Sequence, residues 1–226
     1  MVPSIIPYGD SALLVNFEQR IDREIHQEVL TLYGALINTA GIRYMIPAYC
    51  SLTVVFDPGI IAASDLQEQI QEVVMHKPEK TLRISPQLHS LPVCYDPEFG
   101  PDLDELSTHL GKPVEAIIRA HLETEFYVYM VGFLPGFAYM GDMPEEFNCP
   151  RKSSPRTKVP AGSVGLAARQ TAIYPFESPG GWQLIGRSPV VMFDPLRERP
   201  SLLQAGDHVR FIQIGKEEFQ KIASGS

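Results

Sequence analysis

The sequence predicts an α+β protein of two domains, a small ferredoxin-like α/β domain over residues 1–90 followed by a strand-rich domain over residues 91–226. A length of 226 residues suits two domains, and 44% apolar with 20% charged residues is typical of a folded protein. Helix and strand patterns alternate in the first part. Residues 126–193 instead hold eight glycines and eight prolines between short β-prone runs, which indicates a closed β-barrel or sandwich.

Periodicity in the first domain predicts two helices packed on several strands. Apolar side chains recur at spacings of three and four between Ile25 and Ile37, which predicts a helix over residues 22–39. A capping box formed by Ser64 and Gln67 predicts the start of a second helix. The expected strands cover residues 11–17, 42–48, 52–56 and 88–95.

Two short helices are expected ahead of the strand-rich region. Asp102 is placed to cap a helix over residues 103–110, and Pro113 to begin a helix that continues to about Glu123. The strands expected after them cover residues 127–133, 163–167, 182–185, 190–193 and 209–214.

Charge is unevenly distributed along the chain. Residues 1–125 carry 8 Lys/Arg against 18 Asp/Glu, whereas residues 126–193 carry 6 against 4. The net charge of −8 argues against nucleic-acid binding, which usually needs a basic face. A local excess of positive charge can still attract an anionic ligand. Four basic residues fall within eight positions that hold no acid: Arg151, Lys152, Arg156 and Lys158.

The remaining composition predicts a cytoplasmic protein without a membrane span. The first residues lack a basic segment followed by a long apolar run, and no stretch approaches eighteen apolar residues. Three cysteines far apart in the sequence favour reduced, structural thiols over a disulfide framework.

A first candidate site segment is residues 132–141, with three glycines and two aromatic residues that follow turns. Gly136 allows a backbone to approach a ligand closely, and Phe137 with Tyr139 would form a wall beside it. A plain turn with core aromatics is the alternative.

A second candidate segment, residues 150–160, carries two arginines between three prolines. Arg151 and Arg156 can each clamp a carboxylate or phosphate through two parallel hydrogen bonds, on a loop that the prolines stiffen. Lys152 and Lys158 are expected to be ordinary solvent-exposed surface residues.

Further candidates follow in the same Gly- and Pro-rich region. Gly162 and Ser163 offer backbone N–H groups and a hydroxyl that suit an anion. Trp182 is the only tryptophan of the sequence, and a single tryptophan more often anchors the core than stacks on a ligand. An isolated histidine such as His121 is likewise more often a core residue than a catalytic base. The other expected binding residues are Gln170, Thr171, Tyr174, Gly180, Gly181 and Arg187.

Several catalytic patterns do not occur in the sequence. No Walker phosphate loop, Gly-x-Ser-x-Gly elbow or His-Glu-x-x-His motif is found, and the six histidines lack metal-ligand spacing. No metal site is therefore predicted, and the segments above indicate binding more clearly than self-contained catalysis.

The ordered set of motifs resembles one family, that of the B-type subunit of 5-oxoprolinase and the sporulation-kinase inhibitor KipI, also called allophanate hydrolase subunit 1 or the C and D subdomains of the urea carboxylase carboxyltransferase. The motifs that carry the resemblance are His121, Gly132-Phe-Leu-Pro-Gly-Phe-Ala-Tyr139, Pro150-Arg151, Pro155-Arg156, Val159-Pro-Ala-Gly-Ser163, Gln170-Thr171, Tyr174-Pro175, Ser178-Pro-Gly-Gly-Trp-Gln183 and Gly206-Asp207. The resemblance is strong from His121 to Asp207 and loose before residue 90.

This resemblance implies a cyclophilin-like β-barrel as the second domain and two protein partners, a larger C-type (KipA-like) subunit and an A-type subunit. Such complexes open 5-oxoproline, a lactam, to glutamate while hydrolysing ATP, so ATP with Mg, shared with the partner subunits, is the implied cofactor. Two alternatives remain open: a KipI-like inhibitor that binds a sensor histidine kinase, and a component of urea or allophanate metabolism.

Within the first function we expect Arg151, Arg156 and Arg187 to hold the substrate carboxylate or a phosphoryl group, and His121 to act as an acid, a base or an orienting group. The family would have glycines before Gln170, where this chain has residues 166–169. Arg169 is therefore expected to narrow or re-charge the pocket.

Overall fold

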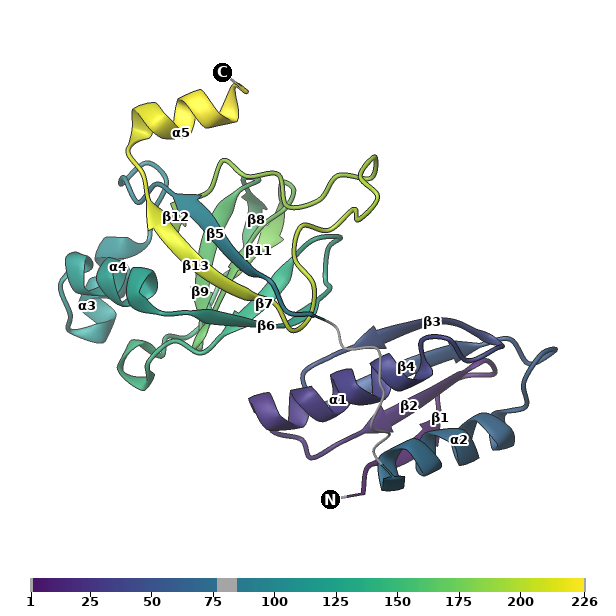
Figure 1. Ribbon diagram of the computed structural model, residues 1–226. Helices are drawn as coiled ribbons and strands as arrows, with labels where there is room; N and C mark the ends of the chain where they lie inside the picture. The colour runs from purple at the N-terminus through teal and green to yellow at the C-terminus, as the bar shows by residue number, and fades with distance from the viewer. Residues whose placement is uncertain (1, 77–84, 226) are drawn as a thin grey trace. The chain divides into compact units, whose positions relative to one another are not determined.

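The computed structural model describes residues 2–76 and 85–225, and the chain divides into two compact units, Met1–Ser85 and Pro86–Ser226 (Figure 1). The predicted boundary at residue 90 falls inside strand β5 (Leu88–Val93). All of β5 belongs to the second unit, because it pairs in parallel with β13 (His208–Gln213). No helix in the described ranges is long and apolar enough to cross a membrane.

The first unit is a four-stranded antiparallel sheet with two helices. Its elements are β1 (Ser4–Pro7), β2 (Ala12–Asn16), α1 (Arg23–Leu36), β3 (Ile42–Pro47), β4 (Ser51–Phe56) and α2 (Ala63–His76). The strands lie in the order β1-β2-β4-β3. Alternate residues of β4, among them Leu52 and Val54, are fully buried and share a core with Val29 of α1 and Leu66 of α2. One apolar face of the sheet therefore packs against both helices.

The chain order within this unit differs in one strand from a ferredoxin-like fold. A ferredoxin-like chain runs β-α-β-β-α-β, whereas this unit runs β-β-α-β-β-α, and β1 takes the edge beside β2. The layered α/β sandwich is thus present, and the ferredoxin-like assignment stays a prediction.

The two helices begin differently from each other. Asp22 caps α1, since its carboxylate accepts the N–H groups of Glu24 (2.8 Å) and Ile25 (3.3 Å). The capping box predicted at Ser64 is wrong, because α2 already begins at Ala63 and the Ser64 hydroxyl instead donates to the carboxylate of Asp65.

The second unit is built on a seven-stranded sheet in the order β12-β9-β10-β7-β6-β13-β5. Its elements after β5 are α3 (Leu103–Leu110), α4 (Val114–Glu123), β6 (Phe126–Val131), β7 (Ala138–Gly141), β8 (Arg156–Val159), β9 (Ser163–Ala167), β10 (Gln170–Ile173), β11 (Ser178–Gly180), β12 (Gln183–Arg187), β13 and α5 (Lys216–Ala223), with a 3₁₀ turn over Glu145–Phe147. Backbone hydrogen bonds between Cys94 and Arg187 join the two edge strands, so the sheet is nearly closed into a barrel.

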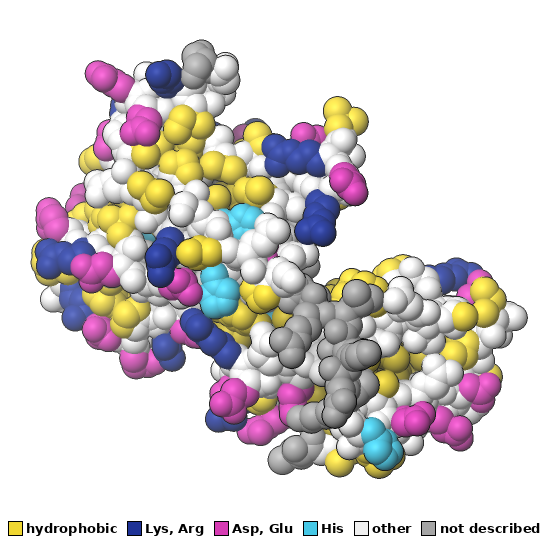
Figure 2. Space-filling model, in the orientation of Figure 1, with side chains coloured by type: hydrophobic (Ala, Val, Ile, Leu, Met, Phe, Trp, Pro, Cys, Tyr) yellow, Lys and Arg dark blue, Asp and Glu magenta, His cyan; other side chains and the backbone are white. Residues whose placement is uncertain are grey.

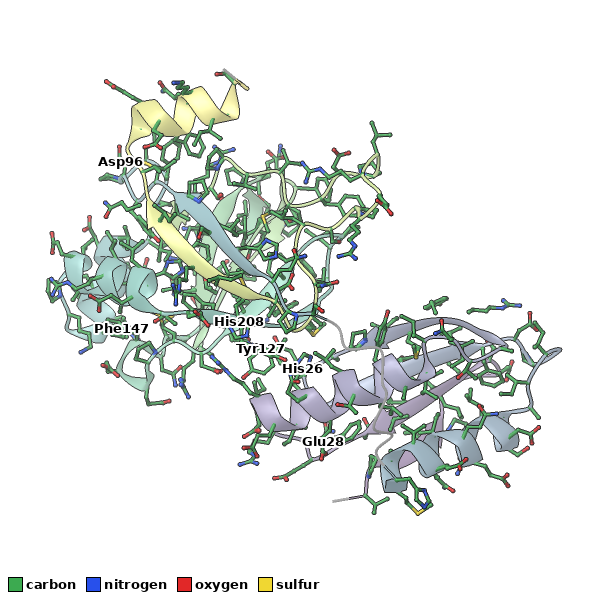
Figure 3. The ribbon with its side chains drawn as sticks, viewed as in Figure 1. His26, Glu28, Asp96, Tyr127, Phe147 and His208 are labelled. Atoms are coloured by element: carbon green, nitrogen blue, oxygen red, sulfur yellow. The ribbon has the colours of Figure 1, made fainter. Side chains whose placement is uncertain are left out.

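Helices α3 and α4 lie against one side of this sheet (Figure 1) and share its main core, to which Phe147 also belongs. His208 at the start of β13 packs edge-on against Tyr127 of β6, with ring centres 5.4 Å apart (Figure 3). On the face that Figure 2 shows, basic and acidic side chains of this unit are interspersed. The strand predicted over residues 190–193 is wrong, since only an isolated bridge between Phe193 and Ser201 forms there.

Candidate functional site

The second unit contains a cleft of about 260 Å³ walled by aromatic rings, which we call the aromatic cleft. Its lining residues come from four separate segments and hold one charged side chain, that of Arg151. The lining residues are Phe133, Phe137, Tyr139, Arg151, Pro155, Tyr174, Pro179, Gly180, Gly181 and Trp182. Seven of them were expected at a site from the sequence: Phe137, Tyr139, Arg151, Tyr174, Gly180, Gly181 and Trp182.

Strand ends hold the rings of the cleft in place. Phe137 and Tyr139 lie at the start of β7, Tyr174 follows β10, and Trp182 lies between β11 and β12. The ring of Phe137 is central, because its centre lies 4.9 Å from Tyr139, 5.2 Å from Tyr174 and 5.8 Å from Trp182, all edge-on. Such edge-to-face packing gives a rigid wall that is apolar on its faces.

Gly180 lets the backbone come close to this wall, whereas Gly136 serves a turn elsewhere. A Cβ on Gly180 would lie 2.4 Å from the Tyr174 hydroxyl, so only glycine fits there. Gly136 has a φ of +81°, and a Cβ on it would lie 2.7 Å from the Cβ of Phe193. Gly136 therefore shapes the turn into β7 and does not line the cleft.

Phe133 was not expected at the site. It is 63% exposed at the cleft and has a φ of +70°, a conformation that bulky residues rarely adopt. Its ring packs edge-on against Phe137, with centres 5.5 Å apart. The contact with Phe137 offsets part of the cost of that backbone conformation.

Arg151 is the free cation of the cleft. Its guanidinium carbon lies 5.8 Å from the centre of the Trp182 ring, within the range of a cation–π contact. In the described part of the chain it has no ion-pair or hydrogen-bond partner. Arg151 also lines two neighbouring hollows, of about 370 Å³ with Gln170 and about 570 Å³ with Gln183. A guanidinium so placed can receive a carboxylate through two parallel hydrogen bonds.

Arg156 and Lys152 are held by a buried carboxylate. Asp102, 2% exposed, accepts hydrogen bonds from Arg156 Nη2 (2.5 Å), Lys152 Nζ (3.0 Å) and the backbone N–H of Leu184 (2.6 Å). Lys152 Nζ also reaches Glu105 at 2.7 Å. The ligand-clamping role expected for Arg156 is therefore corrected, and so is the solvated surface expected for Lys152, because both are engaged within the protein.

Asp102 itself was expected only as a helix cap. It does precede α3, but its side chain makes no cap bond to that helix. Burial on its own raises the pKa of this carboxyl, but hydrogen bonds from Arg156, Leu184 and Lys152 outweigh burial and hold the pKa below its ordinary value. Asp102 is thus ionised at neutral pH.

The structure places His121 and Thr171 in the core, not at a ligand site. Both are 0% exposed. Thr171 Oγ1 donates to the carbonyl of Gly165 (3.1 Å), so it must accept from His121 Nε2 (2.9 Å), and His121 Nδ1 then accepts from the Tyr95 hydroxyl (2.7 Å). Burial lowers the pKa of His121 to about 3, so the ring stays neutral. His121 is thus the core group that a lone histidine more often is, and neither it nor Thr171 has an exposed atom for a ligand. The orienting role of His121 stays a prediction.

The backbone N–H groups of Gly162 and Ser163 are both engaged in hydrogen bonds within the protein. The N–H of Gly162 bonds to the carbonyl of Tyr174 (2.7 Å), and that of Ser163 to the carbonyl of Pro160 (3.2 Å). Neither N–H group is left for an anion, which corrects that part of the prediction, whereas a role for the Ser163 hydroxyl stays a prediction. A Cβ on Gly162 would lie 2.3 Å from the carbonyl oxygen of Ser188, so this glycine permits close packing of two chain segments.

Arg187 and Arg169 do not line the aromatic cleft. Arg187 Nε donates to the carbonyl of Ala161 (2.8 Å), and its guanidinium lies over Phe219 of α5. Arg169 Nε donates to the carbonyl of Met143 (2.7 Å) and pairs with Glu145 at 3.4 Å. Arg169 therefore does not re-charge the aromatic cleft, and the substrate role expected for Arg187 stays a prediction that this cleft does not support.

The titration of the cleft's side chains favours binding over proton transfer. Burial raises the pKa of Tyr139, although the charge of Arg151 lowers it. Burial raises the pKa of Tyr174 as well, more than a hydrogen bond from the Trp182 backbone lowers it. Both phenols stay neutral at physiological pH, so the cleft can hold and orient a small anionic ring. Among the described residues no cluster of three His, Cys, Asp or Glu could hold a metal ion.

Comparison with known proteins gives matches along most of the chain. A family model described as "Carboxyltransferase domain, subdomain C and D" matches residues 3–203. The B-type subunit of 5-oxoprolinase from Bacillus subtilis (strain 168) is 37% identical over 228 residues, which cover 93% of this chain and 92% of that protein. The B-type subunit of 5-oxoprolinase from Escherichia coli O157:H7 is 34% identical over 204 residues, which cover 90% and 93%.

Solved structures share the fold. The crystal structure of TTHA0988 superposes with a TM-score of 0.80 at 35% identity and covers 90% of this chain, which spans 40% of that longer chain. The urea carboxylase of Kluyveromyces lactis gives a TM-score of 0.74 at 19% identity, over 98% of this chain and 22% of that one, and shows the fold alone. These matches show that the chain belongs to the family of the carboxyltransferase domain, subdomain C and D, together with the B-type subunits of 5-oxoprolinase.

Proposed function

We propose that this protein is the B-type subunit of an ATP-dependent 5-oxoprolinase complex and that its aromatic cleft binds the substrate, with Arg151 on the carboxylate. The cleft itself carries the proposal, since it offers an apolar aromatic wall and one unpaired guanidinium. A five-membered lactam with one carboxylate matches both features. The names of the relatives in Bacillus subtilis and Escherichia coli support this substrate.

The chemistry of lactam opening explains why one subunit of the complex would contribute a binding surface. Amide resonance stabilises the lactam, so opening the ring to glutamate needs coupling to ATP, which activates the lactam oxygen for expulsion by water. Catalysis then depends on positioning the ring. Arg151 would fix the carboxylate, while Phe137, Tyr139 and Trp182 would orient the ring and exclude bulk water.

ATP with Mg does not fit the aromatic cleft. A cleft of about 260 Å³ is too small for a nucleoside triphosphate, and no carboxylate lines it to hold Mg. We therefore place ATP on the partner subunits, the C-type and A-type chains, at a surface that meets this cleft. The longer chain of TTHA0988, of which this fold is 40%, supports an arrangement with further protein beside the unit.

We also propose that the second unit is a cyclophilin-like barrel, that the first unit is ferredoxin-like, and that the complex is cytoplasmic. The kinase-inhibitor function requires an apolar surface without a substrate pocket, whereas this unit has a pocket that contains a charged arginine. The urea-related function rests on relatives such as the urea amidolyase of Lachancea kluyveri, at 23% identity.

Co-expression with candidate C-type and A-type subunits tests the proposal. We expect ATP hydrolysis that depends on 5-oxoproline, releases glutamate and stops when this chain is left out. Hydrolysis driven by urea or allophanate in place of 5-oxoproline would instead support the urea-related function, and unchanged turnover without this chain would reject the proposal.

A further inference from the structure

Asp102 binds Lys152 and Arg156, the two basic side chains that follow Arg151 in the sequence. Its side chain is 3% exposed, whereas those of Lys152 and Arg156 are 18% and 28% exposed. A single carboxylate oxygen, Oδ1, accepts from both cations, and Oδ2 accepts from the backbone of Leu184 in β12. The carboxylate therefore ties two long cationic side chains to a strand of the sheet.

Both cations are carried by backbone that adjoins the cleft. Lys152 follows Arg151 directly in the chain, and its own backbone N–H bonds to the carbonyl of Gly181, a lining residue. Arg156 pairs in register with Gly180, another lining residue, across β8 and β11. In the described part of the chain, Arg156 Nη1 is buried without a hydrogen-bond partner, so Asp102 alone orients this guanidinium by hydrogen bonds.

We propose that Asp102 is a positioning residue that limits the aromatic cleft to one free cation and so selects ligands with a single carboxylate over dianions. With Lys152 and Arg156 paired to Asp102, Arg151 is the one charged side chain that lines the cleft. A second carboxylate would enter the aromatic wall without a partner and lose its hydration. This inference rests on the proposed function, because it concerns selection at the same cleft.

The test compares two five-carbon ligands on the full-length chain, the monocarboxylate 5-oxoproline and the dicarboxylate glutarate. Trp182, the single tryptophan of the sequence, lines the cleft and reports binding through its fluorescence. The variant is Asp102→Asn, which keeps an acceptor for Leu184 and removes the charge. Its matched control is Glu105→Gln, which removes the same charge from an exposed partner of Lys152.

In Asp102→Asn we expect the ratio of the two dissociation constants to shift toward glutarate by about tenfold, the order of one added charge contact near a protein surface. Adding Arg156→Met to this variant should reverse most of the shift, and Glu105→Gln should change the ratio by less than about twofold. A ratio that stays unchanged in Asp102→Asn, or a shift that Arg156→Met does not reverse, would overturn the inference.

A second measurement needs no ligand. Iodide is an anionic quencher of tryptophan and acrylamide a neutral one, so the ratio of their quenching constants reports positive charge beside Trp182. We expect Asp102→Asn to raise this ratio above that of Glu105→Gln; equal ratios in the two variants would contradict the inference even if neither ligand binds. Failure of the wild-type chain, alone and with its partner subunits, to bind 5-oxoproline would reject the proposed function instead.

Discussion

The guanidinium of Arg151 lies over the ring of Trp182, with 5.8 Å between the guanidinium carbon and the ring centre. The side chain that can bind an anion and the side chain that can report it are therefore in direct contact. Each comes from a different segment of the second unit, and the pairing of β8 with β11 and a backbone hydrogen bond from Lys152 to Gly181 bring the two segments together.

This contact predicts a direct optical signal for ligand binding. Titrating the wild-type chain with 5-oxoproline should change the fluorescence of Trp182 in a saturable manner. In Arg151→Ala we expect the affinity to fall by about tenfold to a hundredfold, because a hydrogen bond to a charged group contributes about 1.5–3 kcal/mol. Arg151→Lys should keep part of the affinity, since it retains the charge without the planar fork. Equal affinities in all three proteins would reject Arg151 as the carboxylate ligand.

A side chain at position 180 should destabilise the protein, whereas one at position 181 should be tolerated. Gly180→Ala places a Cβ 2.4 Å from the Tyr174 hydroxyl, so we expect the free energy of unfolding to fall by about 1–3 kcal/mol, the range for overpacking. Gly181→Ala is the matched control, because its Cβ would lie 3.6 Å from the nearest atoms, those of Pro155. Denaturant unfolding of both variants measures the difference, and equal losses would contradict the geometry.

His121 should make stability depend on pH. Its pKa is about 3 in the folded protein and near its ordinary 6.5 in the unfolded chain. The full contribution is therefore present above pH 6.5, and it falls by about 1.4 kcal/mol per pH unit below that value as the unfolded chain binds a proton. His121→Gln removes this titration, so its unfolding free energy should decline less steeply than that of the wild type between about pH 6.5 and pH 5. Parallel declines would show that His121 is not buried as a neutral ring.

Replacing Ala168 by glycine should stabilise the protein. It has a φ of +50° at the turn between β9 and β10, where an L side chain costs about 1–2 kcal/mol. Ala168→Gly removes that cost but loosens the unfolded chain, so we expect a net gain of about 0.5–1 kcal/mol in unfolding free energy. Ala167→Gly, in the strand next to it, should instead destabilise the protein. A loss of stability in Ala168→Gly would contradict the turn geometry.

Most residues of the aromatic cleft can be predicted from the sequence, because they lie in segments that are rich in glycine and proline. Glycines and prolines around Phe137, Tyr139 and Trp182 predict turns beside aromatic rings, and the prolines near Arg151 predict a stiff loop. Phe137 and Trp182 are only 1% and 5% exposed, so they are core residues as well, which is the alternative that the sequence also allowed. The donor groups of Gly162 and Ser163 could not be assigned in this way, since their partners are set by which strands pair.

Asp102 and helix α5 show the other limit of sequence patterns. Asp102 lies 49 positions before Arg151 and is predicted as an ordinary helix cap, although its carboxylate binds cations from a distant loop. Helix α5 has only eight residues and buries one of them, Phe219, so its apolar pattern is too short to predict a helix. In both cases tertiary contacts supply what the local pattern lacks.

The central claim is that this chain supplies the carboxylate-binding part of a 5-oxoprolinase site through Arg151. The most direct measurement is the kcat/KM for 5-oxoproline of the complex reconstituted with its partner subunits, compared between Arg151→Ala and Arg187→Ala. The two substitutions remove the same charge, but only Arg151 lines the aromatic cleft. We predict a loss of at least about tenfold, mainly through KM, in Arg151→Ala and of less than about threefold in Arg187→Ala. Equal losses, or a larger loss in Arg187→Ala, would contradict the claim.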